Sequence, residues 1–317
     1  MKPIVLVYEP IHADAVAVLA QKAEIRWASS LDEESLLEQV PPVDGIIVRN
    51  WKVTRRVMEA APRLKVVGRH GIGVDQIDTQ AAHELGIVVV NTPGAATESV
   101  AEHSVGLMIA LSQHIVQADR ALRAGDWQAR YGLTGRDLQH KILGIVGCGR
   151  IGTRVATLCH TALEMPVLYH DIVEVPQAEA RLGARRIPLN ELLATADVVS
   201  LHVPLTAETR GMIGREALRR MKRDAILINT ARGPVVDPAA LVEALQEGRI
   251  AGAGLDVFDS EPLPPDDPLL RLPNVVVTPH MAAFTQEGLL NMAMGVVNDV
   301  LAVLEGRDPQ HPVTGSW

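Results

Sequence analysis

The chain has few cysteines and no long uninterrupted apolar run, and both shortages exclude classes of protein. It contains two cysteines in 317 residues, Cys148 and Cys159, which cannot form a disulfide framework or, by themselves, a four-ligand zinc site. No apolar run approaches the roughly 20 residues of a membrane-spanning helix. The first apolar stretch stops at Glu9 and Pro10, too short for a secretory signal. We therefore expect a soluble, cytoplasmic globular protein.

The chain also lacks an excess of positive charge. Its 30 Lys and Arg residues against 38 Asp and Glu give a net charge of −8, and the basic residues are scattered. A nucleic-acid-binding protein usually carries a basic face, so we expect no nucleic-acid partner. The 11 histidines show no HExxH or comparable ligand spacing, and the sequence has no GxSxG motif. We expect no bound metal, and neither a metal hydrolase nor a serine hydrolase is predicted.

The remaining composition and pattern predict two α/β domains. At 317 residues and 47% apolar content, the chain is long enough for two buried cores. Short apolar runs alternate with helical patterns in two series, which predicts two doubly wound parallel sheets. Strands are predicted at 4–7, 24–27, 45–48, 65–68 and 87–90, then at 142–146, 167–169, 198–201, 225–229, 253–256 and 275–277. Helices are predicted at 12–22, 32–39, 54–61, 75–84 and 285–304, with one long helix from 97 to about 124.

A glycine-rich turn follows the first strand of the second series. Its sequence is GCGRIG, a helical pattern follows, and Asp171 ends the next strand 19 residues after Gly152. That context is typical of dinucleotide binding: Gly147 permits a tight turn, Gly149 lets the backbone approach a pyrophosphate, and Gly152 allows close helix packing. Asp171 can accept hydrogen bonds from ribose hydroxyls and would repel a 2′-phosphate, so NAD is favoured over NADP. The alternative is an ordinary glycine turn.

Three polar residues follow later strands of the same series. Arg232 lies in NTARG, Glu261 in DVFDSEP and His280 in TPH. In a parallel sheet these residues converge at the carboxyl edge, where such folds bind ligands. Hydride transfer to a carbonyl needs a nearby proton donor, which a histidine supplies near neutral pH. A neighbouring carboxylate favours the imidazolium, and an arginine can hold a carboxylate and polarise a carbonyl. Taken singly, each residue has a structural alternative.

These motifs together resemble the D-isomer-specific 2-hydroxyacid dehydrogenase family. The resemblance includes GRHGIGVDQID at 68–78 and NTPGAATESVAEH at 91–103 and covers essentially the whole chain. It implies a flavodoxin-like substrate-binding domain built from residues 1–95 and 286–317. A Rossmann NAD-binding domain of residues 96–285 is inserted into it, with catalysis in the cleft between the two.

The resemblance also implies a role for individual residues. His280 is the acid/base, Glu261 is its partner, and Arg232 binds the substrate carboxylate and carbonyl. The implied cofactor contacts are Gly147, Gly149, Arg150, Ile151, Gly152, Asp171, Val203, Pro204, Thr209, Thr230, Ala231 and Asp256. The implied substrate contacts are Arg49 and the loop of Arg69, Ile72 and Gly73, whose backbone N–H groups hold the carboxylate. Similar proteins are homodimers, with the helix after Thr97 at the interface.

Substrate choice within the family stays open at this point. VRNWKVT at 48–54 resembles the VRSxTKVT stretch of D-3-phosphoglycerate dehydrogenases, in which Arg49 and Lys52 would meet a phosphate or another anionic group. After His280 the chain has MAAF where those enzymes usually have LGAS, which brings the bulky Phe284 near the site. Reductases of hydroxypyruvate and glyoxylate more often look like this. We expect a 2-keto acid of the hydroxypyruvate, glyoxylate or 3-phosphohydroxypyruvate type, with D-3-phosphoglycerate dehydrogenase proper as the alternative.

Two further readings lie outside that substrate class. An NADH-sensing binding protein, similar to the transcriptional corepressors of this fold, would keep much of the same site. A formate or phosphite dehydrogenase relative is a weaker alternative, because formate enzymes of this fold usually have Gln where Glu261 stands. We expect a small 2-hydroxy or 2-keto acid and a second copy of the chain as partners, and no membrane.

Overall fold

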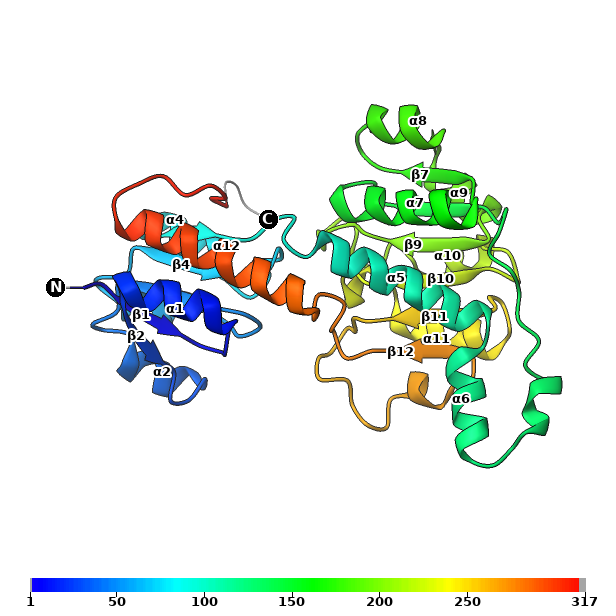
Figure 1. Cartoon of the computed structure of the whole chain (residues 1–317), viewed down its shortest axis with the longest axis horizontal. Coiled ribbons are helices and arrows are strands. Elements are labelled where there is room, and N and C mark those ends of the chain that lie inside the picture. Colours follow the sequence, from blue (N-terminus) through cyan, green and yellow to red (C-terminus); the bar gives the residue numbers. More distant parts are fainter. Residues whose placement is uncertain (1, 314–317) are drawn as a thin grey trace. The chain divides into compact units, whose positions relative to one another are not determined.

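The computed structural model describes residues 2–313, and the chain divides into two compact units (Figure 1). One unit combines the residues up to Ala96 with those from Phe284 onward, and the other comprises Thr97–Ala283. Both units are built on parallel sheets, so the predicted fold class is confirmed.

The first unit has a five-stranded sheet in the order β2-β1-β3-β4-β5. Its strands are β1 (Ile4–Val7), β2 (Glu24–Trp27), β3 (Gly45–Val48), β4 (Val66–Arg69) and β5 (Val88–Val90). All neighbouring strands pair in parallel. Val5 of β1, for example, lies opposite Ile25 of β2 on one side and Gly45 of β3 on the other. The strand order reverses between β1 and β3, which places the ligand-binding switch point of such a sheet at their carboxyl ends.

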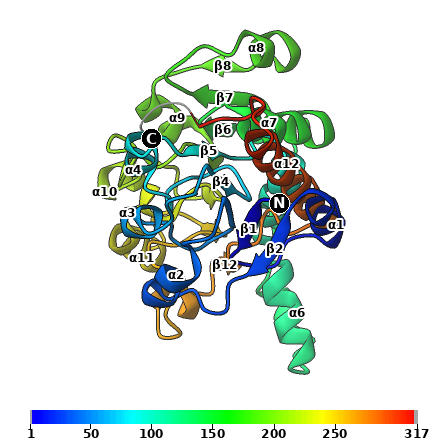
Figure 2. The same cartoon turned by 90° about the vertical axis from the view of Figure 1, so that its left-hand side faces the viewer.

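Helices cover both faces of this sheet (Figure 2). The helices are α1 (Ala13–Lys22), α2 (Glu33–Gln39), α3 (Arg55–Glu59), α4 (Thr79–Glu84) and α12 (Gln286–Leu304). Val5 and Val7 pack with α1 and α12, whereas Ile4 and Leu6 pack on the opposite face with α2, α3 and α4. Successive side chains of a strand point to opposite faces of the sheet, so a strand covered on both faces must be apolar throughout. Strand β1, with the sequence IVLV, has this pattern.

Helix α12 is the chain's most apolar long helix. By length and composition alone its 19 residues, with a mean hydropathy of 1.4, could cross a membrane, and half of that window is buried in the protein. The sequence shows no uninterrupted apolar run there, because Asn298 and Asp299 lie within it. The helix packs along β3, β4, β5 and α1, as a buried core helix does.

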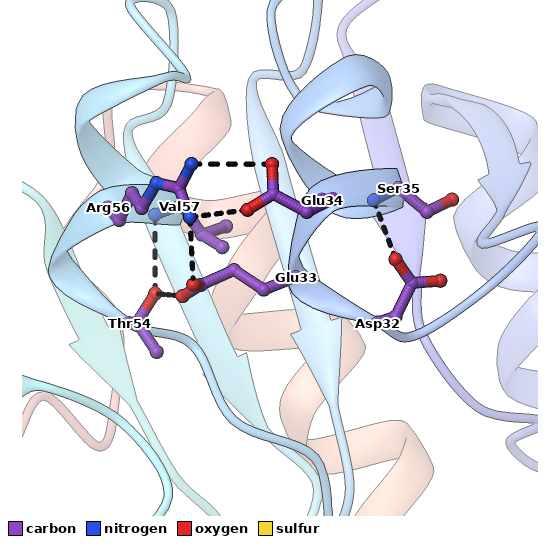
Figure 3. Close-up of polar contacts among 7 residues, drawn as sticks. All are labelled: Asp32, Glu33, Glu34, Ser35, Thr54, Arg56 and Val57. Atoms are coloured by element: carbon purple, nitrogen blue, oxygen red, sulfur yellow. Dashed lines mark hydrogen bonds and ion pairs between the residues drawn. The ribbon is translucent and has the colours of Figure 1, made fainter.

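Polar contacts fix α2 and α3 to one another on the surface of the first unit (Figure 3). Asp32 and Thr54 are the N-caps, and each accepts a hydrogen bond from the backbone N–H three residues later. Thr54 also donates to Glu33 at 2.5 Å, and Arg56 pairs with Glu34 at 2.6 Å. Exposed ion pairs of this kind contribute little singly, so the caps are the stronger determinant of where these short helices begin.

The second unit has a seven-stranded parallel sheet in the order β12-β11-β10-β9-β6-β7-β8. Its strands are β6 (Leu143–Val146), β7 (Val167–His170), β8 (Arg185–Arg186), β9 (Val198–Leu201), β10 (Ile226–Asn229), β11 (Gly252–Leu255) and β12 (Val275–Val277). The order reverses between β6 and β9, as in a dinucleotide-binding sheet.

Helices again form a layer on each face of the seven-stranded sheet. α5 (Thr97–Ser112), α7 (Arg150–Leu163) and α8 (Pro176–Leu182) bury their apolar residues on one face. α9 (Leu189–Thr195), α10 (Arg215–Arg220) and α11 (Pro238–Gln246) bury theirs on the other. The remaining elements are α6 (Ile115–Arg123) and the 3-10 helices η1 (Gln128–Tyr131), η2 (Gly233–Val235) and η3 (Pro268–Arg271).

The long helix predicted from 97 to about 124 is wrong in one respect. The chain forms two helices, α5 and α6, with His114 between them in a left-handed conformation at φ 52°. The Ser112 carbonyl accepts a hydrogen bond at 2.8 Å from the N–H of the loop residue Arg136. The series of hydrogen bonds within the helix therefore ends there. The apolar spacing continues across the break, which is why periodicity alone did not reveal it. Strand β8 was also not predicted, because two arginines carry no strand pattern.

Two glycines of the first sheet give a stability prediction. A Cβ on Gly68 would lie 2.6 Å from methyl groups of Val296 and Val300 on α12, whereas a Cβ on Gly45 would meet nothing closer than 3.2 Å. Gly68→Ala should therefore lower the free energy of unfolding by about 1–3 kcal/mol, the cost of overpacking a core, and Gly45→Ala should lower it by less. Denaturant unfolding measures both; equal losses in the two variants would contradict this packing account.

Candidate functional site

The glycine-rich turn lies at the switch point of the seven-stranded sheet. β6 ends at Val146, Gly147 takes a positive φ of 91°, and α7 begins at Arg150 with Gly149 as its N-cap. Ligands of open α/β sheets bind outside the carboxyl ends of the strands at this point. The free N–H groups at the start of α7 are suited to an anion such as a pyrophosphate.

The glycines of this turn differ in the space around them. A Cβ on Gly152 would lie 2.1 Å from the Gly147 carbonyl oxygen, and a Cβ on Gly147 would lie 2.8 Å from the backbone of His202. A Cβ on Gly149 would have no atom of the described residues within 4 Å. The fold therefore requires Gly147 and Gly152, whereas the open space at Gly149 fits a ligand that approaches the backbone closely. The turn fits a bound dinucleotide.

Asp171 lies beside the turn, directly after β7. Its Oδ2 accepts a hydrogen bond from the Cys148 N–H at 2.7 Å, and its Oδ1 accepts one from the Val173 N–H at 3.2 Å. Each carboxylate oxygen can still accept a further bond, as a ribose hydroxyl would require.

Burial raises the pKa of the Cys148 thiol, which makes Cys148 a packing residue and not a reactive thiolate.

The other predicted cofactor residues follow the same strand ends. Arg150 and Ile151 open α7, Val203 and Pro204 follow β9, and Thr230 and Ala231 follow β10. Thr209 donates to the Pro204 carbonyl at 2.6 Å and so fixes the loop after β9. All of them lie at the carboxyl edge of one sheet, and their contact with a cofactor stays a prediction.

His280 and Glu261 form the central polar contact of the second unit. His280 Nδ1 and Glu261 Oε2 are 2.6 Å apart, and both side chains are partly exposed, at 43% and 36%. Partial burial acts to raise the pKa of Glu261, but the hydrogen bonds from His280 and the Phe258 N–H and the charges of His280 and Arg232 outweigh it, so the pKa is lowered. Because Nδ1 faces the carboxylate, the other ring nitrogen, Nε2, is the one available for proton exchange.

Arg232 comes from the loop after β10, and that loop packs against the Glu261 loop. Asn229 fixes the turn, accepting from the Ala231 N–H at 3.1 Å and donating to the Arg232 carbonyl at 2.9 Å. A Cβ on the next residue, Gly233, would lie 1.9 Å from the backbone of Phe258. Only glycine permits that approach, and it brings Arg232 near enough to Glu261 for its charge to lower the pKa of the carboxyl.

Asp256 holds the segment that carries His280. Its carboxylate is 1% exposed and accepts hydrogen bonds from the Thr278 hydroxyl at 2.5 Å and from the N–H groups of Met281 and Ala282 at 2.9 and 2.8 Å. The backbone of His280, at a left-handed φ of 48°, donates to the Asp256 carbonyl at 2.8 Å. The sequence suggested a cofactor contact for Asp256, which stays a prediction; the structure shows an anchor.

The predicted substrate loop of the first unit has a distinctive hydrogen-bonding pattern. Every carbonyl from His70 to Gly73 accepts a bond: those of His70 and Gly73 from the Arg69 guanidinium, that of Gly71 from the Thr92 N–H, and that of Ile72 from the Asn91 side chain. Among the described residues, no acceptor is bonded to the N–H groups of Ile72 or Gly73. Adjacent free N–H groups of this kind form a concavity for an anion.

Arg49 directly follows β3, at the switch point of the same sheet. Its guanidinium lies over the Phe284 ring, 5.0 Å from the centroid, and donates to the Pro10 carbonyl at 2.8 Å. Glu9 accepts from the N–H of Arg49 at 2.8 Å. Burial lowers the pKa of Arg49, and the nearby Glu9 carboxylate partly opposes this.

Sequence reasoning missed three contributors to these sites. His103 of α5 is 2.9 Å from the Thr278 hydroxyl and 3.7 Å from Asp256, and Asn91 and Thr92 hold the substrate loop. All three lie within the NTPGAATESVAEH segment at 91–103. The segment carried part of the family resemblance, but nothing in its spacing indicated which residues it contacts.

Two variants of the glycine turn separate ligand binding from folding. Gly149→Ala should fold with unchanged stability and bind NADH at least about tenfold more weakly, because its methyl group would occupy space that the pyrophosphate needs. Gly152→Ala should instead lower the melting temperature, because its Cβ meets the Gly147 carbonyl. Fluorescence titration with NADH and thermal unfolding of both variants measure this; undiminished NADH affinity of Gly149→Ala would contradict the assigned pyrophosphate position.

Comparison with known proteins places this arrangement in a family. Residues 105–282 match the model of the D-isomer specific 2-hydroxyacid dehydrogenase, NAD binding domain. D-3-phosphoglycerate dehydrogenase of Archaeoglobus fulgidus is 43% identical over 304 residues, which cover 95% of this chain but 57% of that protein. The chain thus spans little more than half the length of that relative.

Two further proteins match over nearly their whole length. Glyoxylate reductase of Korarchaeum cryptofilum is 42% identical over 320 residues, covering 99% of this chain and 96% of that protein. The NADPH-dependent glyoxylate/hydroxypyruvate reductase of Sinorhizobium meliloti, solved with NADP and malonate, has a TM-score of 0.89 at 34% identity, covering 99% of this chain and 97% of that one. The chain belongs to the D-isomer-specific 2-hydroxyacid dehydrogenases, a family of oxidoreductases with a Rossmann-type NAD-binding domain.

Proposed function

We propose that the protein is an NAD-dependent D-2-hydroxyacid dehydrogenase that reversibly reduces a small 2-keto acid of the glyoxylate or hydroxypyruvate type. The observation that carries this is the 2.6 Å contact of His280 with Glu261, next to the loop of Arg232. A histidine oriented by a carboxylate and accompanied by an arginine is the set that reduction of a keto acid needs.

In the reducing direction, His280, Glu261 and Arg232 each have a separate role. NADH held at the glycine turn and Asp171 would supply the hydride for the carbonyl carbon. Protonated His280 donates the Nε2 proton to the carbonyl oxygen, so a hydride and a proton together convert the ketone into an alcohol. Glu261 stabilises the imidazolium and fixes the ring through Nδ1. Arg232 binds the substrate carboxylate and stabilises the negative charge that develops on the oxygen. Oxidation of the hydroxy acid follows the same path in reverse, with neutral His280 as the base.

The substrate loop of the first unit offers further donors for a carboxylate. The free N–H groups of Ile72 and Gly73 are donors for the carboxylate. His70 belongs to the same loop. Burial, and to a smaller extent the positive charges of Arg49 and Arg69, lower its pKa to about 4. The loop therefore holds the carboxylate with neutral N–H donors at neutral pH and not with a charged imidazole.

NAD is the proposed cofactor in preference to NADP. The S. meliloti relative is NADPH-dependent, so cofactor choice differs within the family. Support for NAD comes from Asp171, whose carboxylate is fixed beside the turn by the N–H groups of Cys148 and Val173. A carboxylate there hydrogen-bonds to ribose hydroxyls and repels a 2′-phosphate.

An unphosphorylated substrate is proposed over 3-phosphohydroxypyruvate, the alternative. A phosphate site needs donors that are free on the ligand side. One face of the Arg49 guanidinium lies against Phe284, and one of its N–H groups is bonded to Pro10. Those contacts leave Arg49 less suited to a dianion. D-3-phosphoglycerate dehydrogenase proper is the second candidate because VRNWKVT resembles a stretch of those enzymes in which Arg49 and Lys52 would meet a phosphate or another anionic group.

Two further properties are proposed, a homodimer and a cytoplasmic location. α6 has no buried residue, and Figure 1 shows it standing off from its own sheet. Several large apolar side chains of this region are 50–71% exposed: Ile115, Leu122, Trp127 and Tyr131. Exposed apolar side chains of this kind mark interaction surfaces.

The cytoplasmic location is supported by the cysteines. Both are free and buried, which suits a reducing compartment.

The activity is tested by following NADH absorbance with a panel of 2-keto acids. We expect turnover of glyoxylate or hydroxypyruvate with NADH, slower turnover of 3-phosphohydroxypyruvate and pyruvate, and little activity with NADPH. His280→Ala should lower kcat by about 10²–10⁴-fold, the contribution of a general acid, without changing NADH affinity. His140 provides the control, because it too has a positive φ, of 61°, and pairs with a glutamate at 3.6 Å; His140→Ala should retain full activity.

Other outcomes of that assay lead elsewhere. Faster turnover of 3-phosphohydroxypyruvate than of hydroxypyruvate would favour the phosphoglycerate dehydrogenase alternative. NADH binding with no turnover of any keto acid, together with an NADH-dependent protein partner, would favour the corepressor-like reading. Full activity of His280→Ala would contradict the mechanism.

The dimer is tested by light scattering after size exclusion. The protein should have twice the mass of one chain, and the double variant Leu122→Glu with Trp127→Glu should be monomeric because it charges the exposed apolar face. Leu85 of the first unit is 42% exposed, and Leu85→Glu should leave the dimer intact. A monomeric wild-type protein would refute the assignment.

A further inference from the structure

The substrate loop of residues 69–73 holds only part of its own shape: Arg69 donates to the carbonyls of His70 and Gly73, and the two carbonyls between them are bonded from outside the loop. Gly71 has a φ of 137°, a conformation that only glycine adopts readily. A loop that turns two consecutive N–H groups outward must turn its carbonyls inward, and each buried carbonyl needs a donor. The donors therefore decide where the N–H groups of Ile72 and Gly73 point.

The donors to the carbonyls of Gly71 and Ile72 come from the segment directly after β5. The Thr92 N–H donates to the Gly71 carbonyl at 3.0 Å, and the Thr92 hydroxyl accepts from the Gly71 N–H at 3.0 Å. The Asn91 side chain donates to the Ile72 carbonyl at 2.7 Å. Thr92 thus holds both sides of the Gly71 peptide region, and Asn91 fixes the next carbonyl.

Both clamping residues are themselves held by packing. Asn91 is 9% exposed and Thr92 is 4% exposed. The Thr92 methyl group packs on α12 at Gly295, where an added Cβ would lie 3.0 Å from it. The Asn91 N–H donates to the His311 carbonyl at 3.3 Å. Side chains held by packing in this way are what the orientation of a neighbouring loop requires.

We propose that Thr92 and Asn91 are positioning residues of the reaction: they orient the N–H groups of Ile72 and Gly73 and so set the affinity for the substrate carboxylate. They touch neither the substrate nor the reacting atoms. The inference rests on the proposed function, because it takes a carboxylate as the ligand of that loop. It predicts an effect on carboxylate binding that is independent of the rest of the substrate.

Two substitutions at one position test this inference. Thr92→Val keeps the shape of the side chain and removes the hydroxyl, whereas Thr92→Ser keeps the hydroxyl and removes the methyl group. Thr54→Val is the control, because Thr54 also accepts a backbone N–H, that of Val57, but caps α3 (Figure 3). It should lower stability without affecting substrate binding.

The readouts are the KM for glyoxylate and hydroxypyruvate, kcat, NADH affinity, and the calorimetric Kd of oxamate, an unreactive analogue with the same carboxylate, in the presence of NADH. Thr92→Val should raise KM and the oxamate Kd by about five- to tenfold, the effect of losing one ordinary hydrogen bond. The factor should be the same for both keto acids, with kcat changed less than about threefold and NADH affinity unchanged. Thr92→Ser should restore most of the affinity.

Other results would refute either the positioning role of Thr92 or the proposed function. Unchanged oxamate affinity in Thr92→Val, or equal losses in Thr92→Val and Thr92→Ser, would refute the positioning role while leaving the proposed function intact. A parallel loss of NADH affinity would show general damage to the fold and would also refute it. If the wild-type protein neither turns over a keto acid nor binds oxamate, the proposed function fails first and this inference fails with it.

Discussion

The hydrogen bond between His280 Nδ1 and Glu261 Oε2, at 2.6 Å, is the contact around which the second unit's loops are arranged. Glu261 is fixed by the Phe258 N–H, and the Phe258 backbone approaches Gly233 so closely that no side chain fits there. His280 is fixed by Asp256 through the residues on either side of it. A loop shift that lengthened this contact would uncouple the acid/base from the carboxylate that orients it.

A common constraint explains where both candidate ligand sites lie. In each unit all strands are parallel and the strand order reverses once, between β1 and β3 or between β6 and β9. Chain segments diverge at that reversal and leave backbone N–H groups without strand partners. The second unit uses this for the glycine turn and α7, and the first uses its own carboxyl edge for Arg49 and the loop of residues 69–73.

The sequence predicted much of the architecture and less of the scaffolding around the site. Strands such as β1, β3 and β9 were predicted to the residue because strands buried on both faces are continuous apolar runs. The glycine turn and the His280–Glu261 pairing were predicted from motifs. The break at His114 was missed because apolar spacing continues through it, and the clamp by Asn91 and Thr92 was missed because it depends on tertiary contacts. Asp256 has the strand-end position of a ligand contact, but its burial and partners are visible only in three dimensions.

The most direct test of the central claim compares kcat/KM in both directions for the wild-type protein and Glu261→Gln, with NADH affinity measured alongside. Glu261, whose pKa is lowered, is a carboxylate at neutral pH, and its 2.6 Å contact with His280 Nδ1 holds the ring. We predict that Glu261→Gln lowers kcat/KM for reduction of the keto acid and for oxidation of the D-hydroxy acid, with NADH affinity unchanged, because the amide keeps the shape of the side chain but no longer stabilises the imidazolium. Equal kcat/KM values for the two proteins would contradict the role of this contact.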